Sequence, residues 1–122
     1  MRGKQYITKP EQYTDIYNRG ASWVDKVVVM KTLHNGLTLS RYGFSVSSRV
    51  GGAVVRNRVK RRLREILRHT SLKSGWDIVL IARPAAARVD YAVLETEVVK
   101  LLSKAKLLGP AVNTEEAGKI AL

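Results

Sequence analysis

The chain has 122 residues, of which 45% are hydrophobic, enough apolar material for one domain with its own core. It carries 22 Lys and Arg residues against 10 Asp and Glu, a formal net charge of +12, which indicates RNA, DNA or an anionic membrane surface as the partner. The absence of cysteine excludes disulfides and thiolate metal sites, and no signal peptide or membrane-spanning apolar run is evident, so we expect a cytoplasmic protein.

A short helix is predicted first. The segment Thr8-Lys9-Pro10-Glu11 has capping-box spacing with the proline in the first turn, and Gly20 is placed to end the helix as a C′ glycine. Tyr13, Ile16 and Tyr17 recur at the i, i+3, i+4 spacing of one helix face. The two tyrosines are either core residues or, beside a basic region, aromatic platforms for unpaired bases.

Two strands joined by a tight turn are predicted next. Residues 24–33 contain the β-branched run Val27-Val28-Val29, which is typical of a strand. Asn35-Gly36 is a typical hairpin turn, and residues 37–46 form the returning strand, with a break or bulge near Gly43. The two strands are therefore expected to form a hairpin.

The remaining elements are a basic helix, a buried strand and a last helix. The basic helix spans about residues 53–69 and follows a loop that ends in Gly51-Gly52. The nearly continuous apolar run at residues 76–82 predicts a central strand covered on both faces. Asp90 can cap the last helix. The apolar face of that helix consists of Leu94, Val98, Leu101, Ala105 and Leu108. This order of elements suggests an α/β sandwich.

The stretch from Arg56 to Arg64 is the strongest functional signal in the chain. Six of its nine residues are basic, and Glu65 is the only acid between Arg56 and Arg68. On a helix, one arc of about 120° collects the apolar positions Val55, Val59, Leu63, Ile66 and Leu67. The helix therefore packs by a narrow seam and shows cations on most of its remaining surface. Because a solvated helix usually mixes charge signs, this density favours a nucleic-acid-binding face.

Two features beside the basic helix have more than one interpretation. Gly51-Gly52 would let backbone approach a phosphate at a helix N-terminus, but a glycine pair is also ordinary turn chemistry. Asn57 could hydrogen-bond a nucleotide or act as a structural cap.

No pair of acids on one element has the spacing for metal or acid–base chemistry, and no nucleophile–base pair stands out. The sequence thus predicts a binding surface with no catalytic or metal-binding residues.

Three segments carry a family resemblance: residues 43–47, residues 51–65 with their Arg56-Asn57-Arg58 core, and residues 77–84. They resemble the bacterial ribonuclease P protein subunit, and the similarity covers about residues 6–108. It implies an α+β fold, an α-β-β-β-α-β-α two-layer sandwich like that of a ribosomal protein domain. The implied βαβ crossover around the basic helix is left-handed, whereas default chirality rules would predict the opposite hand.

The resemblance also implies a domain division and a function. Residues 1–8 are expected to form a flexible leader, residues 9–108 the ribonuclease P protein domain and residues 109–122 a flexible tail. The family's protein joins a large catalytic RNA that removes the 5′ leader of precursor tRNA, leaving a 5′-phosphate, and the RNA with its Mg²⁺ ions performs the hydrolysis. The chain is then a non-catalytic, monomeric subunit of a ribozyme endoribonuclease. Its expected partners are the catalytic RNA and precursor tRNA, not DNA or a membrane, and Mg²⁺ is assigned to the RNA.

Motif matching implies two RNA-binding surfaces. The surface for the catalytic RNA comprises Arg49, Arg56, Asn57, Arg58, Lys60, Arg61, Arg62 and Arg64. The second surface is a cleft between the first helix and the sheet that holds the single-stranded leader, and it is lined by Tyr13, Tyr17 and Met30. Met30 stands where the family has a cleft-lining aromatic, and Ser48-Arg49 stands where the family often has two lysines.

Two other functions fit parts of the sequence. A general RNA- or DNA-binding protein could use the basic helix in a groove, and it would show no preference for the catalytic RNA over other folded RNAs. A membrane-surface helix is disfavoured because the apolar arc lacks Trp and Phe and is wide enough only for a core seam.

Overall fold

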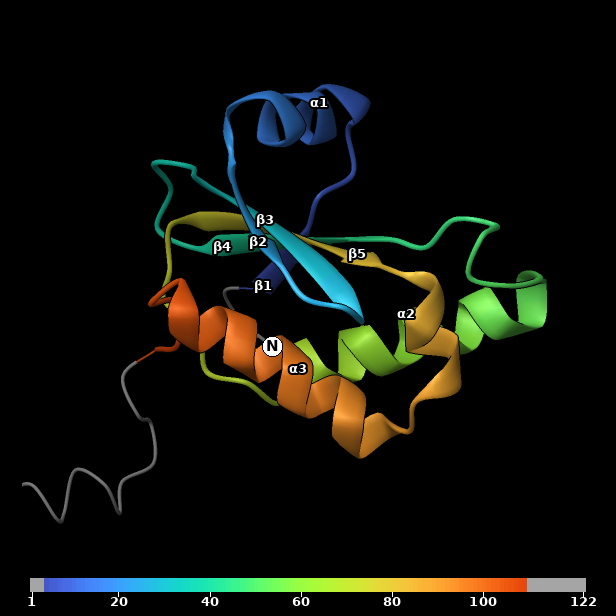
Figure 1. Ribbon diagram of the computed structural model, residues 1–122. Coiled ribbons are helices and arrows are strands. Elements are labelled where there is room, and N and C mark those ends of the chain that lie inside the picture. The colour runs from blue at the N-terminus through green and yellow to red at the C-terminus, as the bar shows by residue number, and fades with distance from the viewer. Residues whose placement is uncertain (1–3, 110–122) are drawn as a thin grey trace, which may run out of the picture.

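The computed structural model describes residues 4–109, which form a five-stranded mixed sheet with helices on both faces (Figure 1). The elements in chain order are β1 (Lys4–Tyr6), α1 (Pro10–Arg19), β2 (Ala21–Val24), β3 (Val28–His34), β4 (Ser40–Ser45), α2 (Ala53–Arg68), β5 (Trp76–Ala82), the 3₁₀ helix η1 (Pro84–Arg88) and α3 (Tyr91–Lys104). The predicted order α-β-β-β-α-β-α is confirmed, and strand β1 precedes it.

The strand order is β1-β4-β5-β3-β2, which places β5 in the centre of the sheet. Strand β5 pairs antiparallel with β3 and parallel with β4, and β1 pairs parallel with β4. Strands β4 and β5 with helix α2 are thus the βαβ unit to which the resemblance assigns a left-handed crossover. Residues 77–80 of β5 are all buried, so the predicted central strand covered on both faces is confirmed.

The predicted hairpin between the strands before and after Asn35 is wrong. The turn itself forms, because the Asn35 side-chain oxygen accepts a hydrogen bond from the Leu37 amide at 2.8 Å and Gly36 adopts a φ of 71°. Strand β5, however, lies between β3 and β4. An apolar strand gains most burial at the centre of a sheet, and this long-range pairing overrides the local turn signal. No bulge interrupts the register of β4 with β5 at Gly43.

Two segments enter the sheet in ways that the sequence did not predict. The strand expected at residues 24–33 begins only at Val28, as β3, and a separate strand β2 covers residues 21–24, because the Asp25 carboxylate accepts a hydrogen bond from the Val27 amide at 2.9 Å and turns the chain. Residues 4–6, expected in the flexible leader, form β1, and the following Ile7 is only 5% exposed. The leader prediction is therefore wrong for this part of the chain.

Helix α1 begins one residue later than predicted. Its N-cap is Lys9 and not Thr8, and the Gln12 side-chain oxygen accepts hydrogen bonds from both backbone amides, at 3.1 and 3.2 Å. Gln12 thus has the role that the capping-box spacing gave to Glu11. Gly20 ends the helix in an extended conformation, with φ −78°, and not as a left-handed C′ glycine.

The hydrophobic core has two parts, one on each face of the sheet (Figure 1). Helices α2 and α3 cover one face, and the predicted seam of α2 lies there, with Val59, Leu63, Ile66 and Leu67 buried. Helix α1 covers part of the other face over a smaller cluster of Ile7, Ile16 and Val79. Asp90 caps α3 as predicted, accepting a hydrogen bond from the Val93 amide at 3.0 Å.

Two predictions concern the ends of the chain and the membrane. Of the predicted flexible tail, residues 110–122 lie outside the described residues. Within residues 4–109, no helix is both long and apolar enough to cross a bilayer. The described part of the chain is thus a sheet with three covering helices and the short η1 turn.

The burial of Tyr42 on β4 leads to a prediction for alkaline pH. Tyr42 is 3% exposed, and desolvation raises the pKa of its phenol from 10.0 to about 12. The fold favours the neutral phenol, so its contribution to the free energy of unfolding is complete below pH 10. That contribution, about 3 kcal/mol at most, is lost as the pH rises from 10 to 12. Urea unfolding at about pH 8 and about pH 11 should show a smaller loss for Tyr42→Phe than for the wild type, and equal losses would contradict the assignment.

Candidate nucleic-acid interface

Helix α2 divides its cations among three directions, the first of which is toward η1. The Arg58 guanidinium donates to the Ala87 carbonyl at 3.4 Å, and the Arg62 guanidinium donates to the Val89 carbonyl at 3.2 Å. Both side chains are half-buried. Part of their hydrogen-bonding capacity therefore holds α2 against the segment that leads to α3.

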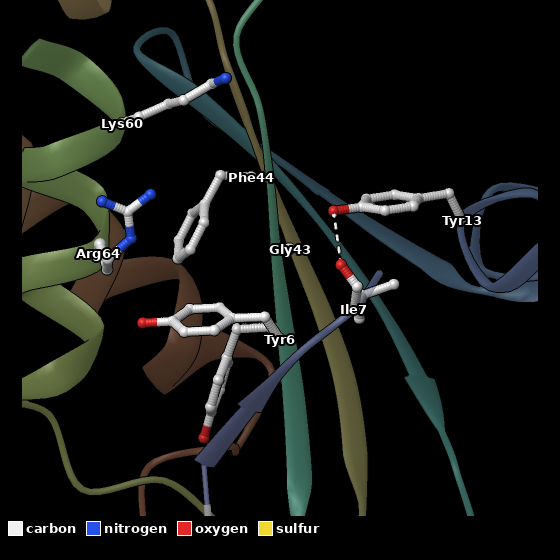
Figure 2. A pocket seen from close by; sticks show the side chains of 8 residues that line it. Tyr6, Ile7, Tyr13, Gly43, Phe44, Lys60 and Arg64 are labelled. Atoms are coloured by element: carbon white, nitrogen blue, oxygen red, sulfur yellow. Dashed lines mark hydrogen bonds between the residues drawn. The ribbon is translucent and has the colours of Figure 1, made fainter. Parts of the chain in front are cut away.

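The second direction is toward the exposed edge of β4. Lys60 and Arg64 lie one helical turn apart, and both approach Phe44 from the α2 side (Figure 2). The Arg64 guanidinium carbon lies 6.0 Å from the centroid of the Phe44 ring, within range of a cation–π interaction. The Arg64 side chain remains exposed, so it can contact a ligand at the same time.

The third direction is outward to solvent. Asn57 and Arg61 are exposed on α2, and Arg49 is exposed in the preceding loop, while Arg56 is half-buried. The acid on this helix, Glu65, pairs with Arg68 and His69, and these contacts lower the pKa of its carboxyl group. None of the ion pairs in the described part of the chain involves a residue predicted to bind the catalytic RNA. These cations therefore form a strongly positive surface without internal neutralisation.

The two predicted cleft tyrosines of α1 lie side by side but differ in environment. Their ring centroids are 6.3 Å apart. The Tyr13 hydroxyl donates to the Ile7 carbonyl at 3.3 Å, and burial raises the pKa of this phenol. Tyr17 is 40% exposed. Tyr13 is thus anchored to the sheet, and Tyr17 offers the more accessible ring face.

The prediction that Met30 lines the cleft is wrong. Its side chain is 0% exposed and packs in the larger core, on the face of the sheet covered by α2 and α3. Successive residues of a strand point to opposite faces, so the β3 residues on the α1 face are Val29, Lys31 and Leu33, all partly exposed. The register of a strand decides which face of the sheet each side chain reaches. The family motif located Met30 along the sequence but did not determine the face on which its side chain lies.

The structure adds a site that the sequence did not indicate, here called the edge hollow. This hollow of about 280 Å³ opens where β1 ends, between α1 and α2 (Figure 2). Its lining residues are Tyr6, Ile7, Tyr13, Tyr42, Gly43, Phe44, Lys60 and Arg64. Tyr6 belongs to a strand of only three residues, too short to give a sequence signal, whereas Phe44 could have been noticed beside the basic helix.

Comparison with known proteins identifies the family. A family model described as Ribonuclease P matches residues 1–106. The chain belongs to the bacterial ribonuclease P protein family. The ribonuclease P protein component of Dehalococcoides mccartyi (strain CBDB1) is 53% identical to it over 108 residues, covering 88% of this chain and 90% of the relative. That of Natranaerobius thermophilus is 39% identical over 104 residues, covering 84% and 90%.

Solved structures agree with this family. The structure of the Staphylococcus aureus RNase P protein matches with a TM-score of 0.77 and 29% identity, covering 89% of this chain and 100% of that one. The RNase P protein from Thermotoga maritima matches with a TM-score of 0.76 and 29% identity, covering 82% and 96%. Membership makes the chain a protein component of ribonuclease P, a tRNA-processing endoribonuclease.

Gly43 on β4 allows the anchored position of Tyr13. A Cβ atom at Gly43 would lie 2.5 Å from the Tyr13 hydroxyl oxygen and 2.9 Å from the ring carbon that bears it. We expect Gly43→Ala to lower the free energy of unfolding by about 1–3 kcal/mol, because the ring must leave its hydrogen bond to the Ile7 carbonyl. Urea unfolding measures the loss, and Gly52→Ala, where a Cβ would meet nothing within 4 Å, is the matched control.

A double variant tests the cause of that loss. If the Cβ acts through the tyrosine ring, adding Gly43→Ala to Tyr13→Ala should cost much less than Gly43→Ala costs in the wild type. Additive losses would show that Gly43 is required for another reason.

Proposed function

We propose that this chain binds the catalytic RNA of ribonuclease P through α2 and the loop before it, and holds the 5′ leader of precursor tRNA beside α1. The chain thereby promotes endonucleolytic removal of the leader, giving mature tRNA 5′ ends. The observation that carries the proposal is the set of α2 and loop cations that no acid of the described chain neutralises. Phosphates of a folded RNA supply the missing negative charge and release counterions when they bind.

The outward part of α2 suits the catalytic RNA. Arg61 and Asn57 are exposed, as is Arg49 in the loop, and they combine guanidinium groups for phosphates with an amide that both donates and accepts. Arg58 and Arg62 already donate to backbone carbonyls of the chain. Their role is then to hold the helix in position as well as to present the remaining donors to RNA.

The face beside α1 suits a single strand. Tyr17 offers an exposed ring on which an unpaired base can stack, and Tyr13 extends the aromatic surface. Lys31 lies on the same face of the sheet and, with Met30 excluded, adds a cation for the leader backbone. The proposed leader surface therefore comprises Tyr13, Tyr17 and Lys31.

The hydrolysis itself remains with the RNA. Within residues 4–109, no three His, Cys, Asp or Glu side chains are grouped so that they could hold a metal ion. Mg²⁺ belongs to the catalytic RNA in this proposal, as the family resemblance implies. The protein residues named here bind and orient RNA.

Cleavage of a precursor tRNA by its cognate catalytic RNA at low Mg²⁺, with and without the protein, tests the proposal. We expect strong stimulation, and we expect it to fall for Arg61→Ala and for Lys60→Ala, because each variant removes a cation that binds phosphate. The slope of log K against log salt for RNA binding should decrease by about 0.7–0.9 for each phosphate interaction removed. Lys104→Ala, an exposed cation on α3 with the same charge change, should behave as wild type.

Two results would contradict the proposal. One is wild-type stimulation by both α2 variants at low and at high salt. The other is no stimulation by the wild type together with equal binding to unrelated folded RNAs, which would indicate a general nucleic-acid-binding protein.

A further inference from the structure

The edge hollow lies between the two proposed RNA surfaces and belongs fully to neither. Lys60 and Arg64 reach it from α2, while Tyr13 reaches it from α1 on the other side of β4 (Figure 2). Its floor is the edge of β4 just beyond the last residue of β1. Tyr6 and Phe44, which line it between these walls, have no role in the surfaces described above.

The lining of the edge hollow has a distinctive chemistry. Four of its eight residues are aromatic, two are cationic and none is acidic. Its volume of about 280 Å³ is just below the range of small-ligand sites, roughly 300–1,000 Å³, so it suits a single nucleotide and not a larger group. An aromatic ring beside two cations matches a nucleotide, whose base stacks while its phosphate meets the charges.

Tyr6 is the residue best placed to stack on such a base. Its ring is 53% exposed, although it lies only 6.2 Å from the Phe44 ring, centroid to centroid. The Phe44 ring is in turn contacted by the Arg64 guanidinium at 6.0 Å. Phe44 thus has both side chains as neighbours, and the Tyr6 ring stays more than half exposed. Strand β1 fixes the Tyr6 backbone beside the hollow by pairing with Tyr42 of β4.

From this arrangement we propose that the edge hollow binds one unpaired RNA nucleotide, with the base stacked on Tyr6 and the phosphate held by Lys60 and Arg64. This inference rests on the proposed function and adds a site between its two surfaces. The nucleotide comes either from the leader of precursor tRNA or from an unpaired position of the catalytic RNA, since both present the same chemistry.

The test uses the full-length protein with Tyr6→Ala and Tyr6→Phe. Tyr6→Ala should weaken binding of the RNA that supplies the nucleotide by about 5- to 140-fold, the usual range for loss of one stacked base. Tyr6→Phe keeps the ring and should bind as wild type. Val93→Ala, which shortens an exposed apolar side chain on α3, is the matched control and should change nothing.

Two arms of the experiment distinguish the sources of the nucleotide. Binding of the protein to the catalytic RNA alone reports a nucleotide of that RNA. Binding of the assembled enzyme to precursor tRNAs with long leaders, and with leaders cut to one nucleotide, reports a leader nucleotide, because the Tyr6→Ala defect should then vanish with the short leader.

The site fails if Tyr6→Ala binds both RNAs as wild type does, or if Tyr6→Phe is as defective as Tyr6→Ala. A wild-type protein that still stimulates cleavage in that case would leave the proposed function intact. A wild-type protein that does not stimulate cleavage would remove the proposed function, whatever the result at Tyr6.

Discussion

The burial of β5 on both faces is the constraint on which the rest of the structure depends. Its residues 77–80 are all buried, so layers of protein must cover the strand above and below, and neighbours must pair with both of its edges. Strands β3 and β4 take those edges, and helix α2, which connects β4 to β5, covers one face. Helix α1 covers the other face. The two proposed RNA surfaces therefore lie on opposite sides of one sheet, and residues of both line the edge hollow at β4.

The narrow apolar seam of α2 decides how its cations are used. Because Val59, Leu63, Ile66 and Leu67 occupy one arc, the charged residues on either side of the seam point to the two flanks of the helix. On one flank Arg58 and Arg62 satisfy backbone carbonyls near η1, and on the other Lys60 and Arg64 border Phe44. A single helix thus anchors itself, carries the cations proposed to bind the catalytic RNA and forms one wall of the edge hollow.

The spacing of apolar residues predicted the helices and strands that bury one regular face. It could not predict which strands pair with each other. The seam of α2, the apolar run of β5 and the Asp90 cap of α3 are local patterns, and the structure confirms them. The neighbour of β4 is decided by a strand more than thirty residues away, so the Asn35-Gly36 turn gave the wrong partner. At the candidate site, the cations of α2 could be predicted from the composition of the segment. The face on which Met30 lies depends on strand register, and the position of Tyr6 depends on a strand of only three residues, so neither could be predicted.

The short length of β1 explains how the chain keeps part of a sheet edge open. Strand β1 pairs with only three residues of β4, and its ladder ends with the hydrogen bond from the Ile7 amide to the Tyr42 carbonyl at 2.7 Å. An open edge normally invites pairing with another strand. Beyond that ladder the Tyr13 ring lies against Gly43, and the Tyr13 hydroxyl donates to the Ile7 carbonyl at 3.3 Å. A side chain and not another strand therefore borders the β4 edge on the α1 side, while Lys60 and Arg64 border it on the α2 side.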